Sequence, residues 1–96
     1  MNDLRILSHG QITDLSKGFK RKNGETFSIM VVAKNASSVV TTALCTCRCV
    51  CDTEASPFPV NVGDWTPAKI QEISANGISL SDFDVYWGAG ETAKKA

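Results

Sequence analysis

Hydrophobic and polar residues alternate along two stretches of the chain. In residues 25–33, Phe27, Ile29 and Val31 fall on one face, and mostly smaller or polar residues fall on the other. In residues 38–52 the odd positions carry small apolar side chains, and the even positions become polar towards the end. Alternation with period two among β-branched residues predicts β-strands. Because strands seldom exceed about ten residues, we expect a kink near residues 42–44 of the second stretch.

Turn signals at intervals of about ten residues predict a mainly β fold. Asn23-Gly24 favours a tight turn, because both residues tolerate a positive φ. Pro57 and Pro59 restrict their segment to a sheet edge or a loop. Residues 78–80 and 83–87 are expected to form two closing strands around Ser81-Asp82. The whole pattern predicts one domain over residues 1–96, a small antiparallel β-sandwich or barrel, with residues 88–96 as a flexible tail.

One short α-helix is expected at about residues 67–75. Thr66 is a suitable N-cap, and Pro67 fits the first helical position. Ile70 and Ile73 would share one face of this helix. The pair Asn76-Gly77 supplies a stop signal at its C-terminal end.

Length and composition indicate whether the chain folds and whether it is expected to span a membrane or be secreted. The chain has 96 residues, of which 43% are hydrophobic, so we expect one folded domain and no wholesale disorder. It contains no apolar stretch of about 20 residues, and its first residues do not resemble a secretory signal. These features predict a protein that has no membrane span and is made in the cytoplasm.

The formal net charge is zero, but the two halves of the chain differ. Residues 1–50 hold seven bases and three acids, which gives +4, and residues 51–96 hold three bases and seven acids, which gives −4. If the halves occupied different faces, copies of the chain could attract one another head to tail. If the halves interleave in the fold, this asymmetry disappears.

Four cysteines occupy alternate positions, at Cys45, Cys47, Cys49 and Cys51. On an extended strand alternate residues lie roughly 7 Å apart, so four thiols would form a row and could not surround one zinc ion. A disulfide between neighbouring thiols of the row would sit at the limit of about 7 Å between Cα atoms. We therefore expect buried, reduced thiols that pack as small hydrophobic groups. A thiol-based metal or redox protein is the alternative.

A short basic run, Lys17, Lys20, Arg21 and Lys22, surrounds Phe19. Basic residues beside an aromatic ring can hold phosphates and stack a base. One such run in a neutral protein is less than a nucleic-acid interface normally offers, so a nucleic-acid-binding module is kept only as an alternative function.

The sequence contains no recognisable catalytic constellation. The single histidine, His9, has no nucleophile near it in the sequence. Asp82 and Asp84 could share Ca²⁺, but the rest of a calcium loop is missing. Residues 88–90, Gly-Ala-Gly, lack the remainder of a phosphate-binding fingerprint. We expect no catalytic residue, cofactor, metal or small-molecule substrate.

Three aromatic residues, Trp65, Tyr86 and Trp87, are the candidates for a protein–protein interface. Tyr86 and Trp87 are adjacent, so on a strand they face opposite ways and one of them points outward. An outward aromatic residue on so small a domain is a plausible contact with a neighbouring subunit.

The segments 58–67 (FPVNVGDWTP) and 84–90 (DVYWGAG) resemble small β-structured virion proteins of tailed bacteriophages, such as phages of gut Bacteroidetes. This resemblance covers the C-terminal part of the chain. It implies a head, decoration or tail component with no active site, assembled in the host cytoplasm in many copies. Its partners would be other copies of the chain and other virion proteins.

Overall fold

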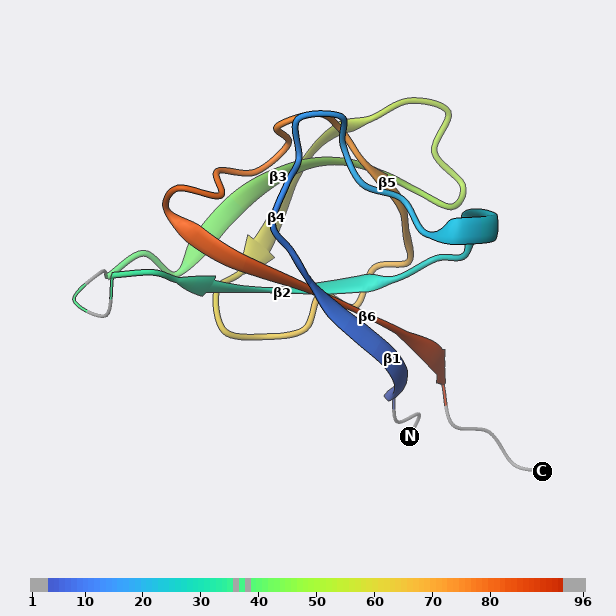
Figure 1. The fold of residues 1–96 in the computed structure, drawn as a ribbon, viewed down its shortest axis with the longest axis horizontal. Helices are drawn as coiled ribbons and strands as arrows, with labels where there is room; N and C mark the ends of the chain where they lie inside the picture. The colour runs from blue at the N-terminus through green and yellow to red at the C-terminus, as the bar shows by residue number, and fades with distance from the viewer. Residues whose placement is uncertain (1–3, 36, 38, 93–96) are drawn as a thin grey trace.

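The computed structural model describes residues 4–35, 37 and 39–92, and it contains two three-stranded antiparallel sheets. Sheet A has the order β1-β6-β2, and sheet B has the order β4-β3-β5. The strands are β1 (Leu4–Ile12), β2 (Ser28–Ala33), β3 (Thr42–Cys49), β4 (Ser56–Asn61), β5 (Ile70–Ile73) and β6 (Phe83–Thr92), with a 3-10 turn η1 (Lys22–Gly24) between β1 and β2. Figure 1 shows this arrangement. The mainly β, antiparallel class expected from the sequence is confirmed.

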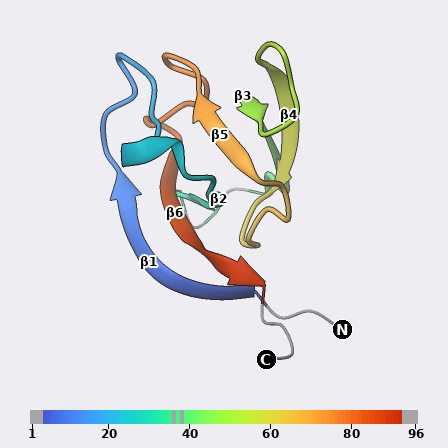
Figure 2. The same cartoon turned by 90° about the vertical axis from the view of Figure 1, so that its right-hand side faces the viewer.

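The two sheets face each other as layers in a sandwich-like arrangement, as Figure 2 shows. One core lies between them and draws on both sheets. Its fully buried side chains are Ile29, Val31 and Val85 from sheet A and Cys45, Cys47, Ile70 and Ile73 from sheet B. The sheets are also joined by hydrogen bonds, because Phe27 and Ile70 exchange backbone bonds of 2.9 and 2.8 Å.

The alternation in residues 38–52 is confirmed where it forms β3. Ala43, Cys45 and Cys47 are buried, whereas Thr42 and Leu44 are exposed. The strand starts at Thr42, and a turn at Val50 and Cys51 ends it. It is therefore shorter than the whole alternating stretch.

The predicted helix at residues 67–75 is wrong. Ile70–Ile73 form strand β5, and Cys49, Arg48 and Cys47 of β3 pair with Ile70, Glu72 and Ile73. Gln71 is thus an extra residue in a β-bulge. The bulge lets Ile70 and Ile73 both face the core at a spacing of three, which is the spacing that also marks one face of a helix. The stop signal becomes a tight turn with Asn76 at φ 53°.

The predicted start of a tail at residue 88 is also wrong. Residues 88–92 continue β6 and pair with β1 as far as Leu4 opposite Thr92. Residues 93–96 lie outside the described residues. Pairing with β1 therefore keeps the chain in the sheet beyond Trp87.

The two halves of the sequence interleave in the fold. Strand β1, from the first half, pairs with β6 from the second. Ion pairs also join the halves, Lys34 with Asp84 at 3.8 Å and Arg48 with Glu72 at 3.6 Å. Within the described residues, no helix has the length and apolar character that a membrane crossing requires.

Candidate interaction surfaces

Tyr86 and Trp87 lie on opposite faces of β6, as their adjacent positions predict. Val85 and Ala89 are buried in the core. Trp87 shares their face, because alternate residues of a strand point the same way. Tyr86 therefore belongs to the outer face of sheet A. Of these two candidates, Tyr86 is the outward one.

Trp87 is covered by its own chain. A Cβ atom built at Gly10, its partner on β1, would lie 2.8 Å from the indole Nε1. The Phe19 ring lies 6.1 Å from the indole between centroids, and the Arg21 guanidinium carbon lies 4.7 Å from the ring centroid. Trp87 is half-buried against the core in this setting. Trp87 therefore contributes to packing of the core. The interface candidates that remain on the outer face are Tyr86 and Trp65.

A row of side chains crosses the outer face of sheet A. Gln11 pairs with Tyr86, Tyr86 with Met30, and Met30 forms a bridge with Trp65. Residues directly opposite each other in antiparallel pairs share a face, so these four side chains form one outer row. Tyr86, Met30 and Trp65 are each half-buried, and Gln11 is exposed. The structure thus brings together Tyr86 and Trp65 through Met30, which the sequence did not single out.

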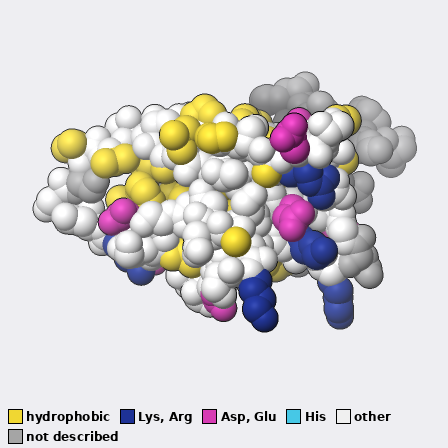
Figure 3. Space-filling model, turned by 90° about the horizontal axis from the view of Figure 1, so that it is seen from above, with side chains coloured by type: hydrophobic (Ala, Val, Ile, Leu, Met, Phe, Trp, Pro, Cys, Tyr) yellow, Lys and Arg dark blue, Asp and Glu magenta, His cyan; other side chains and the backbone are white. Residues whose placement is uncertain are grey.

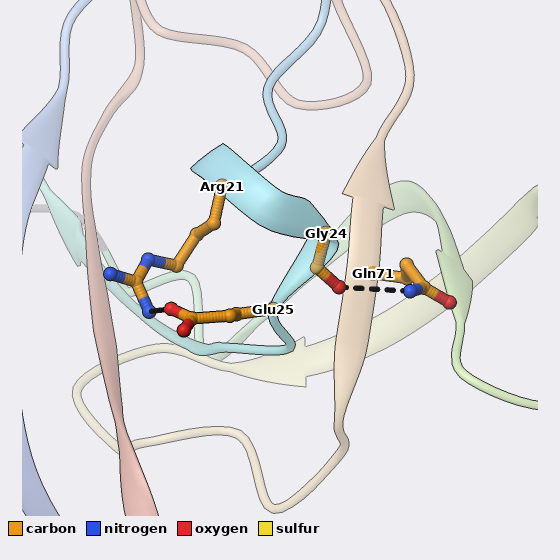
Figure 4. Close-up of polar contacts among 4 residues, drawn as sticks. All are labelled: Arg21, Gly24, Glu25 and Gln71. Carbon is orange, nitrogen blue, oxygen red and sulfur yellow. Dashed lines mark hydrogen bonds and ion pairs between the residues drawn. The ribbon is translucent and has the colours of Figure 1, made fainter.

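The basic run lies in and beside η1, and one of its four charges is already paired. An oxygen of Glu25 lies 2.5 Å from Nη1 of Arg21, as Figure 4 shows. The same segment is tied to β5, because Nε2 of Gln71 donates to the Gly24 carbonyl at 3.0 Å. The other three, Lys17, Lys20 and Lys22, are exposed. Arg21 serves the fold through Glu25 and Trp87, which weakens the basic run as a phosphate site.

The four cysteines were expected to be buried, and only part of the row is. Cys45 and Cys47 are buried, Cys49 is half-buried, and Cys51 is exposed because the chain turns after β3. A hydrogen bond to Cys47, together with burial, raises the pKa of the Cys45 thiol, and the same bond lowers the pKa of Cys47. All four are free thiols. Among the described residues, no three His, Cys, Asp or Glu side chains are placed to hold a metal ion.

The histidine, the aspartates and the glycine-containing segment considered in the sequence analysis do not come together in one site. His9 is exposed on β1 opposite Gly88. The Asp82 carboxylate accepts a hydrogen bond of 3.0 Å from the Ser79 hydroxyl, while Asp84 faces Lys34. The two carboxylates therefore have different partners. The Gly88–Gly90 segment lies inside β6 and does not form a loop.

Each sheet has two edge strands. Of these four strands, β2, β4 and β5 are protected from pairing with a further strand. The outer edge of β2 is covered by the segment after β4, because Val31 and Ile29 accept bonds of 2.7 and 2.8 Å from Gly63 and Thr66. Strand β5 is bonded on its free side by residues 19 and 27. Strand β4 carries two prolines at alternate positions of its six residues. Proline lacks the N–H that a further strand would need, so it blocks pairing there.

Strand β1 is the fourth edge, and it is open. It pairs with β6 on one side only. A bulge at Leu7 interrupts the pairing between Ile6 and Ser8. Residues 8–12 then run as regular strand with neither proline nor charge, and Ser8, His9 and Gln11 are exposed. Among the described residues this is the edge whose backbone groups remain available to another strand.

Exposed hydrophobic residues gather at the connection between β2 and β3. Val39, Leu44 and Val40 are 91%, 62% and 46% exposed, and Val32 at the end of β2 is 39% exposed. Figure 3 shows the molecule from above, and hydrophobic side chains gather on its left half, at the end where the connection between β2 and β3 lies in Figure 1. Most of the charged side chains in this view lie towards the other end.

Comparison of the chain with protein-family models, with curated proteins and with solved structures finds no match.

Proposed function

We propose that this protein is a non-catalytic structural subunit that acts through protein–protein contacts. Its setting is a bacteriophage virion, as a capsid auxiliary, decoration or tail component. The observation that carries the proposal is the open edge of β1 in a fold whose other edges are guarded.

The open edge supports the proposal because unpaired strand edges are a liability in isolated proteins. An exposed row of N–H and C=O groups invites pairing with another chain, and natural proteins block such rows with prolines, charges, β-bulges or covering segments. This chain uses a covering segment at β2 and prolines at β4. On β1 the bulge at Leu7 and the charge of Arg5 protect only the first residues of the strand, and residues 8–12 carry none of these devices. An open stretch of this kind is explained if another chain adds a strand to it.

The outer row supplies side chains for the same contact. Gln11 lies on β1 itself, and Tyr86, on the neighbouring strand β6, is its direct pair. A strand added to β1 would place its own side chains beside Gln11 and within reach of Tyr86. Aromatic residues and methionine are enriched in interfaces, so the row offers an apolar anchor next to the backbone pairing.

The virion setting follows from the resemblance of segments 58–67 and 84–90 to phage virion proteins. Virion components are present in many symmetric copies, and a subunit that adds strands to its neighbours' sheets suits such an assembly. Copies of the chain and other virion proteins are the partners of this proposal.

Light scattering during size-exclusion chromatography tests the proposal across a tenfold range of concentration. We expect a discrete oligomer for the wild type: a dimer if two β1 edges pair with each other about a two-fold axis, or a trimer, pentamer, hexamer or larger ring if β1 receives a different segment of a neighbouring copy. The double variant His9→Lys/Gln11→Lys places two charges on the open edge and should shift the mass towards the monomer. The control Thr53→Lys/Ala55→Lys adds the same charge at exposed positions between β3 and β4. A strictly monomeric wild type, or an edge variant that keeps the wild-type mass, would contradict the proposal.

A further inference from the structure

The thiols of Cys49 and Cys51 occupy a different backbone conformation from those of Cys45 and Cys47. Cys45 and Cys47 lie within strand β3, whereas Val50 and Cys51 form a turn after it. The Asp52 N–H donates to the Cys49 carbonyl at 3.0 Å, and the Cys49 N–H donates to the Asp52 carboxylate at 2.9 Å. Residues 49–52 are therefore held in a β-turn by two hydrogen bonds.

The type of this turn follows from the backbone angles. Types II, I′ and II′ each need a positive φ at a central residue. Among the described non-glycine residues only Asn76 has a positive φ, so Val50 and Cys51 do not. A hydrogen-bonded turn with negative φ at both central residues is type I, in which the first central residue is close to helical.

A helical residue at Val50 brings the flanking cysteines within disulfide range. Helix geometry places Cα atoms two residues apart at about 5.4 Å. In an extended strand the same separation is roughly 7 Å. Disulfides span Cα separations of about 4.4–6.8 Å. The turn thus brings the Cα atoms of Cys49 and Cys51 inside the disulfide range, whereas the Cα atoms of Cys45 and Cys47, whose thiols share a hydrogen bond, stay at its limit.

Exposure also distinguishes the two pairs. Cys51 is exposed and can be reached from solvent, whereas Cys45 and Cys47 are buried. Burial raises the pKa of the Cys49 thiol, as do the nearby Cys47, with which this thiol shares a hydrogen bond, and Asp52. An incoming disulfide therefore reaches the sulfur of Cys51 first. Cys49 reacts in a second step, with the sulfur of Cys51. Closing the disulfide requires the Cys49 side chain to turn from Cys47 towards Cys51.

We propose that Cys49 and Cys51 form a reversible dithiol–disulfide site that exchanges with small disulfides such as glutathione disulfide. In the first step the Cys51 thiolate attacks glutathione disulfide, forms a mixed disulfide and releases one glutathione thiolate. In the second step Cys49, after losing its proton, attacks the Cys51 sulfur, closes the Cys49–Cys51 bond and releases the second glutathione. The two protein thiols are oxidised, and one glutathione disulfide is reduced to two glutathiones. This site does not depend on the proposed structural function.

The sequence allows a sharp experiment, because Arg48 separates the two pairs of cysteines. Trypsin yields residues 35–48, which hold Cys45 and Cys47, and residues 49–69, which hold Cys49 and Cys51. The folded, reduced full-length chain is incubated with glutathione disulfide, free thiols are blocked with N-ethylmaleimide, and the digest is analysed by mass spectrometry. We expect peptide 49–69 to lose both of its alkylatable thiols and two hydrogen atoms, while peptide 35–48 keeps both thiols.

Two variants test the order of the steps. Cys49→Ser should stop after the first step and retain one glutathione on Cys51. Cys51→Ser, at an exposed position, should lose the reaction altogether. A disulfide within peptide 35–48, a link between the two peptides or between two chains, or no oxidation of the folded protein under conditions that oxidise the urea-unfolded chain would each overturn the proposal. Reaction of Cys51→Ser at Cys49 would overturn it as well.

Discussion

The substitution Thr66→Val should stabilise the protein, although it removes a polar group next to a proline. The Thr66 side chain is 4% exposed, and its hydroxyl oxygen is buried without a hydrogen-bond partner. The Thr66 backbone N–H already donates to the Ile29 carbonyl at 2.8 Å. Valine keeps the branched shape and the backbone bond and removes only the unpaired hydroxyl.

The expected gain follows from the cost of burying an unpaired polar group. That cost is about 1–3 kcal/mol, so replacing the hydroxyl of Thr66 with a methyl group should raise the free energy of unfolding by about 1–2 kcal/mol. For a domain of this size each kcal/mol raises Tm by about 4–8 °C. The opposite sign is expected if Thr66 caps a helix, because losing an N-cap costs about 1 kcal/mol.

Urea unfolding followed by far-UV circular dichroism measures this difference, with equal m values as the check that only stability has changed. Thr66→Ser keeps the hydroxyl and removes the methyl group, so it should lower stability. Thr42→Val, at an exposed position of β3, should change the free energy of unfolding by less than about 0.5 kcal/mol. Destabilisation by Thr66→Val would refute the reasoning and show that the hydroxyl has a partner in the native state.

Three further perturbations test the packing around the candidate surfaces. Gly18 has φ +78°, and a Cβ there would lie 2.6 Å from the Ile73 carbonyl oxygen, so Gly18→Ala should cost about 2 kcal/mol or more in urea unfolding; wild-type stability would contradict this. Arg21→Ala should cost about 0.5–1 kcal/mol and make tryptophan emission easier to quench with acrylamide, because Arg21 covers Trp87; unchanged quenching would argue against that cover. Burial and a raised pKa should keep Cys45 unreactive towards maleimide until the protein unfolds, and labelling of the native protein at Cys45 would contradict its place in the core.

The β class and the inward face of β3 could be predicted because they depend on local alternation. Ala43, Cys45 and Cys47 read as one face in the sequence and are one face in the structure. That residues 56–61 are not a central strand followed equally directly from Pro57 and Pro59, and the structure decides for an edge strand over a loop. In each case the deciding property belongs to the residues themselves.

The helix at residues 67–75 could not be rejected from the sequence for a physical reason. A bulge at Gln71 gives two buried isoleucines the same spacing as neighbours on a helical face. The bulge lies in the pairing of β3 with β5, which joins residues as far apart in the sequence as Cys47 and Ile73, so no local signal specifies it. The local signals at Thr66, Pro67 and Asn76 lie outside the bounds of β5, which runs from Ile70 to Ile73, and they did not specify the type of this element.

The candidate interface was only partly predictable. The opposite directions of Tyr86 and Trp87 follow from adjacency, but which of them faces outward depends on the sheet that covers the other face. The cover of Trp87 by Phe19 and Arg21 comes from a distant segment. The open edge of β1 is likewise a property of strand order, which no local pattern in residues 4–12 reveals.

The most direct test of the central claim is hydrogen exchange of β1 as a function of assembly. In an edge strand, alternate amides point away from the sheet, so about half of those in residues 4–12 should exchange rapidly in the monomer. Exchange followed by mass spectrometry is compared between dilute protein and protein concentrated enough to assemble. We predict that β1 gains protection on assembly and that β4, with its blocked edge, does not. If the mass rises while exchange in β1 stays unchanged, the open edge is not the contact and the account is wrong.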